Sequence, residues 1–514
     1  MALAGCAGPG PYRSAADDFT SKAFEDRCQS LYADTDASIA TISIDFGASN
    51  DVRDDFLSKM HDKIDGTPKE LKPCWKTAYE HHSAAKYDLY YAEFDDAGQA
   101  TDIARQKTAY RQSELYLIEN SIRKALREEK GVGLNIVVFT HGWHGNARAD
   151  NNYSTEFKAI LQDIAVREDA YAKSVRGQDA HRMPHRVLGI EIAWRGDSLL
   201  TPALPFYPAS QNVANIWDRK LAAETLSTGS VQELLAFLNE VYLENSCHGT
   251  QRNRQLSGES CERVHMLSIG HSFGALINFR ALTPRLESGL NVDWCQRVYG
   301  FGDMTILLNP AFEGARYRGL FNNAIDRPTL ISPYFGDEQC AASTTAKNGE
   351  VQIPSIVTLQ SLGDTATGTF FPIFRTVTTP FAQTLSDEEA SEKVEALGWV
   401  ADFRTHLLTL PPPTANATAD ECSNLVDRVN SFCPFRSNLA VRVNRQVGTH
   451  KQWMQLLWQP GIAGKTFPNY MPLWSVAVDT AIMKDHDDIW NPLIVKLISV
   501  LFTDAYVQTE RLHF

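Results

Sequence analysis

The stretch VHMLSIGHSFGALIN, residues Val264–Asn278, decides the fold of this chain. Its mostly apolar first half predicts a strand buried on both faces, as in a parallel sheet. The small and apolar residues after Gly274 predict the start of a helix that packs closely on that sheet. Between the two lies Gly270-His271-Ser272-Phe273-Gly274, the G-x-S-x-G pattern of a sharp turn that exposes its serine. The stretch therefore predicts a strand, a tight turn that carries a nucleophilic Ser272, and a helix.

Further strand candidates lie on both sides of this stretch and alternate with helix candidates. The expected strands are Tyr87–Gln99, Leu134–Thr140, Arg186–Trp194, Met304–Asn309, Ser355–Ser361 and Leu473–Val478. The expected helices are Ser113–Gly131, Ser154–Lys173 and Ser230–Glu244. Short strands that alternate with helices indicate the α/β class, with a mostly parallel central sheet covered by helices on both faces.

Three regions fall outside this alternation. Residues 1–85 are polar with spaced apolar positions, which predicts an N-terminal helical extension. The main domain then spans residues 86–514 and carries two expected cap or lid insertions, at about 195–220 and 370–466. We place helix-like patterns around His406 and His450 inside the second insertion.

Composition excludes some classes of protein. The chain has 514 residues, a net charge of −13 and 43% hydrophobic residues, which suffices for a sizeable core. An acidic chain without a basic stripe argues against a nucleic-acid partner. The apolar run Pro492–Phe502 is shorter than the roughly 18 residues of a membrane span, so we expect a buried helix there.

The cysteines and the N-terminus favour an exported protein. The start, MALAGC, resembles the lipobox of bacterial lipoproteins, in which Cys6 would carry the lipid that attaches the protein to a membrane. Eight cysteines remain, an even number that fits disulfides in an oxidising compartment. They fall into sequential pairs: 28 with 74, 247 with 261, 295 with 340, and 422 with 433. We therefore expect the periplasm or cell envelope of a bacterium.

The strand, turn and helix around Ser272 resemble those of the α/β-hydrolase superfamily. The resemblance covers about residues 86–514. It implies a mostly parallel sheet, a serine nucleophile, an oxyanion hole in the loop after an earlier strand, and the chain order serine, acid, histidine.

The stretch VVFTHGWHGNA, residues 137–147, fits that earlier strand and loop. In the family, the backbone N–H after the His-Gly pair and the N–H after the nucleophile face the reacting carbonyl. These donors would be Trp143 and Phe273, and they would stabilise the oxyanion of the transition state. We expect His141, His144 and His271 to contact the substrate.

The family order places the catalytic base downstream of the acid. Past residue 361 the histidines are His406, His450, His486 and His513. His486 lies in a polar loop between a strand and the last amphipathic helix, the position that the fold requires. His486 is therefore the expected base, which activates a serine hydroxyl that is a poor nucleophile alone.

The acid should follow a strand between the nucleophile and the base, where it can orient the imidazole. Asp364 follows the strand that ends at Ser361 and is the first choice. Glu313, after the preceding strand, is the alternative, because some relatives carry the acid there. Asp303 precedes its strand and would point to the opposite edge.

These residues predict a serine hydrolase that cleaves a carboxylic ester through an acyl-enzyme. The aromatic residues near the expected site favour an apolar or lipid-like ester. The sequence shows no zinc-ligand spacing, Walker loop or dinucleotide turn, so we expect no metal and no cofactor. Two alternatives remain open: a surface-anchored lipoprotein that binds a partner and has an inactive site, and an acyl-transferase that uses the same triad.

Overall fold

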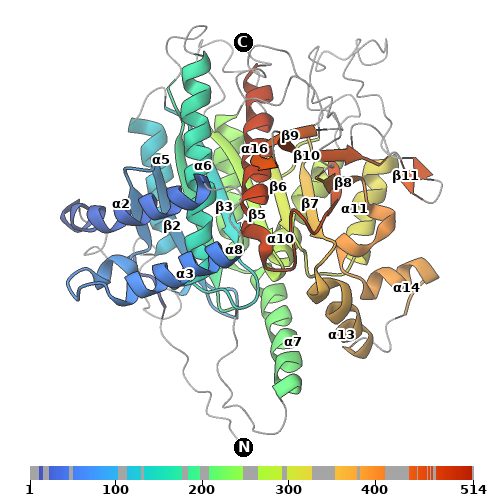
Figure 1. Ribbon diagram of the computed structural model, residues 1–514. Helices are drawn as coiled ribbons and strands as arrows, with labels where there is room; N and C mark the ends of the chain where they lie inside the picture. The colour runs from blue at the N-terminus through green and yellow to red at the C-terminus, as the bar shows by residue number, and fades with distance from the viewer. Residues whose placement is uncertain are drawn as a thin grey trace, which may run out of the picture.

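The structure is a computed structural model (Figure 1). It describes residues 11–15, 22–44, 50–101, 113–128, 132–175, 183–196, 208–246, 264–291, 298–326, 353–378, 383–410, 439–447, 450–459, 461–462, 465–466 and 471–511.

An eleven-stranded sheet with the strand order β1-β2-β4-β3-β5-β6-β7-β13-β8-β10-β9 runs through the molecule. The strands from β2 to β8 in this order are mutually parallel: β2 (Tyr87–Phe94), β4 (Arg186–Trp194), β3 (Leu134–Thr140), β5 (Val264–His271), β6 (Met304–Leu308), β7 (Ile356–Ser361), β13 (Leu473–Val478) and β8 (His406–Thr409). At the two edges of the sheet the strands pair antiparallel with their neighbours: β1 (Tyr79–His82) with β2, β10 (His450–Trp458) with β8, and β9 (Leu439–Val447) with β10. The expected α/β class with a mostly parallel sheet is confirmed.

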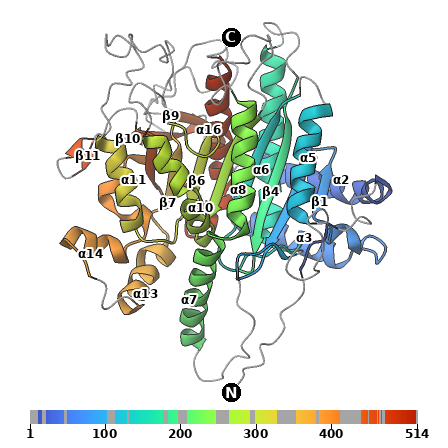
Figure 2. The same ribbon diagram turned by 180° about the vertical axis from the view of Figure 1, so that it is seen from behind.

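Helices cover both faces of the sheet (Figures 1 and 2). One face lies against α6 (Asn152–Val175) and α16 (Pro492–Arg511), which contribute Ile160 and Leu497 to a shared apolar core. The other face lies against α5 (Glu114–Glu128), α8 (Ser230–Asn245), α10 (Phe273–Leu290) and α11 (Ala315–Asp326). Successive side chains of a strand point to opposite faces of the sheet and enter the two cores alternately. This explains why the strands are apolar at nearly every position.

The register of the sheet brings several strand ends to one edge. Thr140 at the end of β3 pairs with Gly270 of β5, and His271 pairs with Leu308 at the end of β6. Ser361 at the end of β7 pairs with Val478 at the end of β13. Loops that leave these carboxyl ends therefore meet, as is usual for ligand sites in open parallel sheets.

The described part of the N-terminal extension contains the helices α2 (Lys22–Ile44), α3 (Asn50–Asp65) and η1 (Lys72–Trp75). Strand β1 lies before the expected boundary near residue 85, and it belongs to the sheet, where it pairs with β2. Its alternating residues Tyr79–His82 are too few to show a period in the sequence.

The expected insertions contain more regular structure than the sequence suggested. Helix α7 (Pro208–Leu226) begins in the first insertion. The second contains α13 (Phe371–Thr378), α14 (Asp387–Val394), η4 (Leu397–Trp399) and η5 (Ala401–Phe403), and η3 (Ala366–Phe370) leads into it. Figures 1 and 2 place α7 and α13 at the same end of the molecule.

The helix-like patterns around His406 and His450 are wrong. Both segments are strands, β8 and β10, and with β9 they extend the main sheet. A short pair β11 (Gly461–Ile462) and β12 (Lys465–Thr466) follows. Short apolar runs fit a strand or a helix equally well, and here sheet pairing decided between them.

One expected disulfide is present, between Cys28 of α2 and Cys74 of η1. The other six cysteines of the expected pairs, and Cys6, lie outside the described residues. Among the helices that the structure describes, none combines the length and the apolar character needed to cross a bilayer.

Candidate active site

Ser272 occupies the sharp turn between β5 and α10. Its backbone has φ 54° and ψ −118°, a left-handed conformation that costs a non-glycine residue about 1–3 kcal/mol. The turn is tight because α10 starts against the end of β3. A Cβ on Gly274 would lie 2.1 Å from the Thr140 carbonyl oxygen, so that position requires glycine. The strained turn presents the Ser272 hydroxyl at the carboxyl edge of the sheet.

His486 reaches this hydroxyl from the loop between β13 and α16. Its Nε2 lies 2.9 Å from Ser272 Oγ, although 214 residues separate the two in the sequence. Its Nδ1 lies 2.8 Å from Asp364 Oδ2. The structure therefore joins the three expected residues Ser272, His486 and Asp364 in one hydrogen-bonded chain, in the arrangement of a nucleophile, a base and an orienting acid.

Asp364 is buried at the end of β7 and is fixed by its neighbours. Thr367 donates to it twice, from its hydroxyl at 2.5 Å and from its backbone N–H at 3.0 Å. The side-chain amide of Gln360 donates to Asp364 Oδ2 at 3.1 Å, and the Trp399 indole N–H donates to the Thr367 hydroxyl. Thr367 lies in η3, a single π-helical turn, a distortion often found at functional sites.

The pKa values of the pair are shifted in opposite directions. Burial raises the pKa of Asp364, but the hydrogen bond and charge of His486 and the two bonds from Thr367 outweigh it and lower that pKa to about 2. Burial lowers the pKa of His486, but Asp364, helped by Asp487 and Asp485, raises it above the ordinary value. Asp364 is thus ionised at neutral pH, and its charge favours the protonated form of the His486 ring.

The backbone carbonyl of His486 is also held in place. The Nε2–H of His271 and the Nδ2–H of Asn309 donate to it at 3.0 and 2.9 Å. The Asn309 amide donates in addition to the Asp485 carbonyl, and its Oδ1 accepts from the Ser361 N–H at 2.8 Å. Asn309 therefore connects the ends of β6 and β7 with the loop of the base.

Asn309 is a residue whose role the sequence did not indicate. It is fully buried and has φ 41°, a conformation that asparagine tolerates better than most residues. Its position directly after the strand Met304–Leu308 was the available signal, because it places the side chain at the edge where the site forms.

The loop after β3 packs directly on the turn of the nucleophile. A Cβ on Gly142 would lie 2.8 Å from Ser272 Cβ and 3.0 Å from His271 Nδ1, so glycine permits this approach. Trp143 follows in the loop, and Phe273 is the first residue of α10. The first N–H groups of a helix have no acceptor within it. The expected oxyanion donors Trp143 and Phe273 thus flank the nucleophile from the loop and from the helix.

His141 is fully buried at the start of that loop. Its Nε2 accepts from the Trp194 backbone N–H at 3.1 Å, so the proton is on Nδ1, which donates to the Gly142 carbonyl at 3.0 Å. The Trp194 indole N–H donates to the His141 carbonyl at 2.9 Å. Both ring nitrogens serve the protein, and His141 fits a structural role rather than the substrate contact that the sequence predicts.

The other two expected substrate contacts differ from each other. His271 is fully buried, and burial together with the charge of His486 places its pKa well below the ordinary value, so it stays neutral and donates from Nε2. It holds the backbone of His486 through this hydrogen bond. His144 is exposed, has φ 65° and stacks on Trp143 with ring centroids 3.9 Å apart. Substrate contact stays a prediction for His144.

The alternative candidates for acid and base do not reach the site. Glu313 is buried against three cations: Lys220 Nζ at 3.0 Å, Arg316 Nε at 2.6 Å and Arg375 Nη2 at 2.8 Å. Asp303 accepts from the Met266 N–H at 2.7 Å, at the opposite end of the strands. His406 is buried beside Trp474. The side chain of His450 and the whole of His513 lie outside the described part of the chain.

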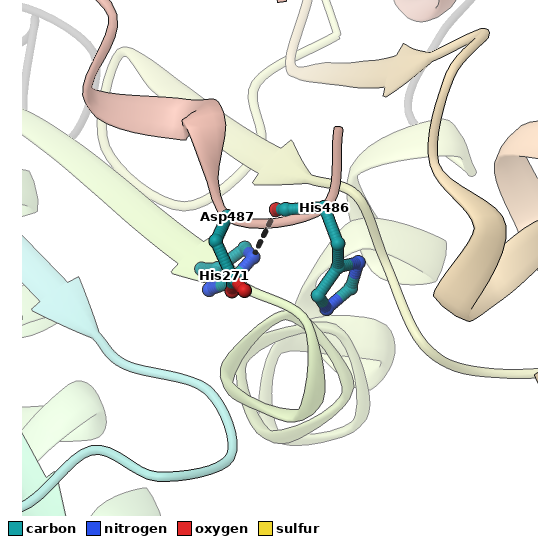
Figure 3. A group of neighbouring side chains, drawn as sticks. All are labelled: His271, His486 and Asp487. Atoms are coloured by element: carbon teal, nitrogen blue, oxygen red, sulfur yellow. Dashed lines mark hydrogen bonds between the residues drawn. The ribbon is translucent and has the colours of Figure 1, made fainter. Parts of the chain in front are cut away.

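Within the described residues, one group of side chains offers metal-ligand atoms at suitable spacing: His271, His486 and Asp487 (Figure 3). Their donor atoms lie within 4.8 Å of one another. The hydrogen bonds argue against a metal there. Both ring nitrogens of His486 are already bonded, to Asp364 and to Ser272, so this ring has no nitrogen left for a metal, while His271 donates from Nε2 to the His486 carbonyl. The group fits a hydrogen-bonded support of the base loop.

Comparison with known proteins does not extend this description, because neither a family model nor a curated protein matches the chain.

Proposed function

We propose that this protein is a serine hydrolase that cleaves carboxylic esters through an acyl-enzyme, on an α/β-hydrolase fold. The observation that carries the proposal is the chain of hydrogen bonds from Ser272 Oγ to His486 and on to Asp364, at 2.9 and 2.8 Å. The strained turn between β5 and α10, the parallel sheet and the order of the three residues along the chain add support.

In this mechanism, Ser272 Oγ attacks the ester carbonyl while His486 Nε2 takes its proton. Asp364 holds the ring with Nδ1 protonated and stabilises the imidazolium. The negative charge on the carbonyl oxygen is stabilised by the backbone N–H groups of Trp143 and Phe273. His486 then gives its proton to the leaving alcohol, and the acyl group stays on Ser272 until water, activated by His486, releases the acid.

The surroundings of the site favour an apolar ester. The half-buried Trp143 lies in the loop that faces Ser272, and Trp217 of α7 contacts Phe374 of α13 with ring centroids 5.3 Å apart. Phe370 and Ile373, which follow Asp364 in η3 and α13, are 65% and 59% exposed. Apolar side chains at these positions suit an acyl chain or an aromatic group better than a charged one.

The test is hydrolysis of p-nitrophenyl esters from C2 to C16, together with labelling by a fluorophosphonate. Ser272→Ala should abolish both, with a loss of kcat on the order of 10⁶-fold. Ser499→Ala is the matched control, since this buried serine of α16 bonds only locally, to the Val495 carbonyl. A folded wild-type protein that neither hydrolyses any ester nor takes up the label would refute the proposal and favour a binding role.

We also propose that the protein is exported, because the Cys28–Cys74 disulfide fits an oxidising compartment. Mass spectrometry of the protein from its native host, with and without reduction, checks this. A disulfide absent before reduction would contradict export.

A further inference from the structure

The N-terminal extension touches the loop that carries Trp143. This oxyanion loop, residues 141–151, contacts the N-terminal platform, which we define as residues 11–15, 22–44 and 50–77. The Ala147 carbonyl accepts from Arg13 Nε at 2.7 Å. Ala149 packs in an apolar cluster with Cys28, Cys74 and Trp75. Asp150 lies 3.8 Å from the His61 ring on α3. Three contacts of different kinds thus join the second half of the loop to the platform.

Arg13 is held through its Nε, its Nη1 and the face of its guanidinium, while its Nη2 is buried without a hydrogen-bond partner among the described residues. Its guanidinium is fully buried and lies 3.5 Å above the Tyr91 ring. Its Nη1 donates to the Trp75 and Thr77 carbonyls and to Glu80 Oε1, at 3.0, 3.2 and 3.1 Å. The Arg13 backbone N–H donates to Glu93. A planar guanidinium with so many partners has a single orientation, so its Nε–H offers Ala147 a fixed donor.

The two halves of the oxyanion loop are therefore anchored in different places. The first half is held by Trp194, which bonds to the ring and the carbonyl of His141. The second half is held by the platform through Arg13 and Ala149. Trp143 lies between the two anchors. Its N–H must lie about 3 Å from the developing oxyanion, so small displacements of the loop weaken the stabilisation.

We propose that the N-terminal platform is a positioning element for the oxyanion loop, with Arg13 as the positioning residue that connects them. The inference rests on the proposed function of Ser272 and on the expected role of Trp143. The Cys28–Cys74 disulfide supports the same contact, because it joins α2 to η1, the segment whose Trp75 carbonyl accepts from Arg13. The extension thereby acts on catalysis without touching the substrate.

The test uses Arg13→Lys, which keeps the positive charge near Glu80 but lacks the Nε–H that donates to the Ala147 carbonyl. With an ester substrate we expect kcat to fall ~10- to 100-fold, with KM and the acidic limb of the pH profile unchanged. A thionoester, in which sulfur replaces the carbonyl oxygen of the substrate, tests the oxyanion hole directly, because a thiocarbonyl sulfur accepts hydrogen bonds poorly. The preference for ester over thionoester should shrink in Arg13→Lys.

Arg318→Lys is the matched control. It makes the same change in a half-buried ion pair with Glu392, which joins α11 and α14. Figure 1 places these helices at the opposite edge of the sheet from the platform. Arg318→Lys should keep the ester preference of the wild type. Because Arg13→Lys could fail to fold, Cys28→Ala/Cys74→Ala is a second variant, which loosens the platform without a change of charge and should shift the preference in the same direction.

Hydrogen–deuterium exchange of residues 141–151 provides a readout that needs no activity. Faster exchange of this loop in the Arg13 and cysteine variants, but not in Arg318→Lys, is expected. Unchanged exchange and an unchanged ester preference in both variants would overturn the inference. A wild type without Ser272-dependent hydrolysis would instead refute the proposed function, while the exchange experiment would still report whether the platform holds the loop.

Discussion

Asp364 and His486 show how two residues determine each other's charge. Burial opposes both shifts, but Asp364 raises the pKa of His486, and His486 together with the bonds from Thr367 lowers the pKa of Asp364 to about 2. The pair is therefore prepared to hold an imidazolium without protonating Asp364. The hydrogen bonds from Thr367 and Gln360 leave Asp364 no other orientation.

Asp364→Asn should lower kcat by about 10⁴-fold, because an amide cannot stabilise the imidazolium and favours the wrong tautomer of His486. Removing the carboxylate also lowers the pKa of His486. The activity requires neutral His486, so the acidic limb of the kcat/KM profile should move to lower pH. Asp487 is exposed and raises the pKa of His486 less than Asp364 does. Asp487→Asn should therefore move the acidic limb only slightly to lower pH and keep most of kcat. Full activity of Asp364→Asn would mean that another carboxylate orients the base.

Asn309 offers a prediction that separates backbone strain from hydrogen bonding. Asn309→Gly and Asn309→Ala both remove the amide that holds the His486 carbonyl, so each should lower kcat about tenfold with little change in KM. A φ of 41° is unfavourable for alanine but not for glycine. The alanine variant should therefore be less stable than the glycine variant by about 1–2 kcal/mol. Denaturant unfolding and steady-state kinetics measure the two effects. Equal kcat in wild type and both variants would show that the base loop holds its position without Asn309.

At the scale of elements, Glu313 joins three helices that flank the site. Its carboxylate contacts Lys220 of α7, Arg316 of α11 and Arg375 of α13. Burial raises the pKa of Glu313, but the three cations outweigh it and lower that pKa to about 2. Since the folded value lies below the unfolded one of about 4.5, the ionised carboxylate stabilises the fold above pH 4.5. This contribution is lost as the pH falls through 2.

Glu313→Gln should therefore destabilise the protein by about 3–5 kcal/mol at neutral pH, since it leaves buried cations without their anion. The difference between variant and wild type should shrink as the pH falls from 4.5 towards 2. The pH profile of hydrolysis should keep its acidic limb, because Glu313 does not touch His486. A limb that moved as in Asp364→Asn would instead make Glu313 the acid. Chemical unfolding at several pH values, with hydrolysis measured in parallel, distinguishes the two.

At the scale of the whole molecule, the extension, β4 and α6 share a buried charge network. Glu80 of β1 binds Arg13 and Lys158 of α6, while Glu191 of β4 accepts from Ser154 at 2.9 Å. Burial raises the pKa of Glu191 to about 7, more than the hydrogen bond and the nearby cations lower it. A carboxyl group with a raised folded pKa favours the folded state below its unfolded pKa of about 4.5, and this stability is lost as the pH rises through 7.

Glu191→Gln removes this titration and should stabilise the protein relative to wild type at pH 8, by about 1–3 kcal/mol, with little difference at pH 5. Urea unfolding at the two pH values measures this. Ser154→Ala is the companion variant, because it removes the hydrogen bond that stabilises the ionised form and should destabilise the protein most at pH 8. A difference between Glu191→Gln and wild type that did not depend on pH would show that Glu191 is ionised throughout.

The sequence by itself determined the alternating strands and the turn at Ser272, and it indicated His486 and Asp364 as candidates, which the structure places beside Ser272. These features are local, or follow from the order of the residues along the chain: an apolar run, a pair of glycines, a polar loop before a helix. It also placed a strand at Leu134–Thr140, and the structure has β3 at the same residues.

Only the tertiary structure decided the rest, because the deciding contacts lie far apart in the sequence. β8 and β10 are strands because neighbouring strands offer them partners, although their residues suit a helix equally well. His141 turns inward because Trp194, 53 residues later, bonds to it, and Asn309 gains its role from a loop more than 170 residues away. The platform holds the oxyanion loop through Arg13 and Ala147, which are separated by 134 residues. No local pattern records such a contact, because each partner alone is an ordinary residue.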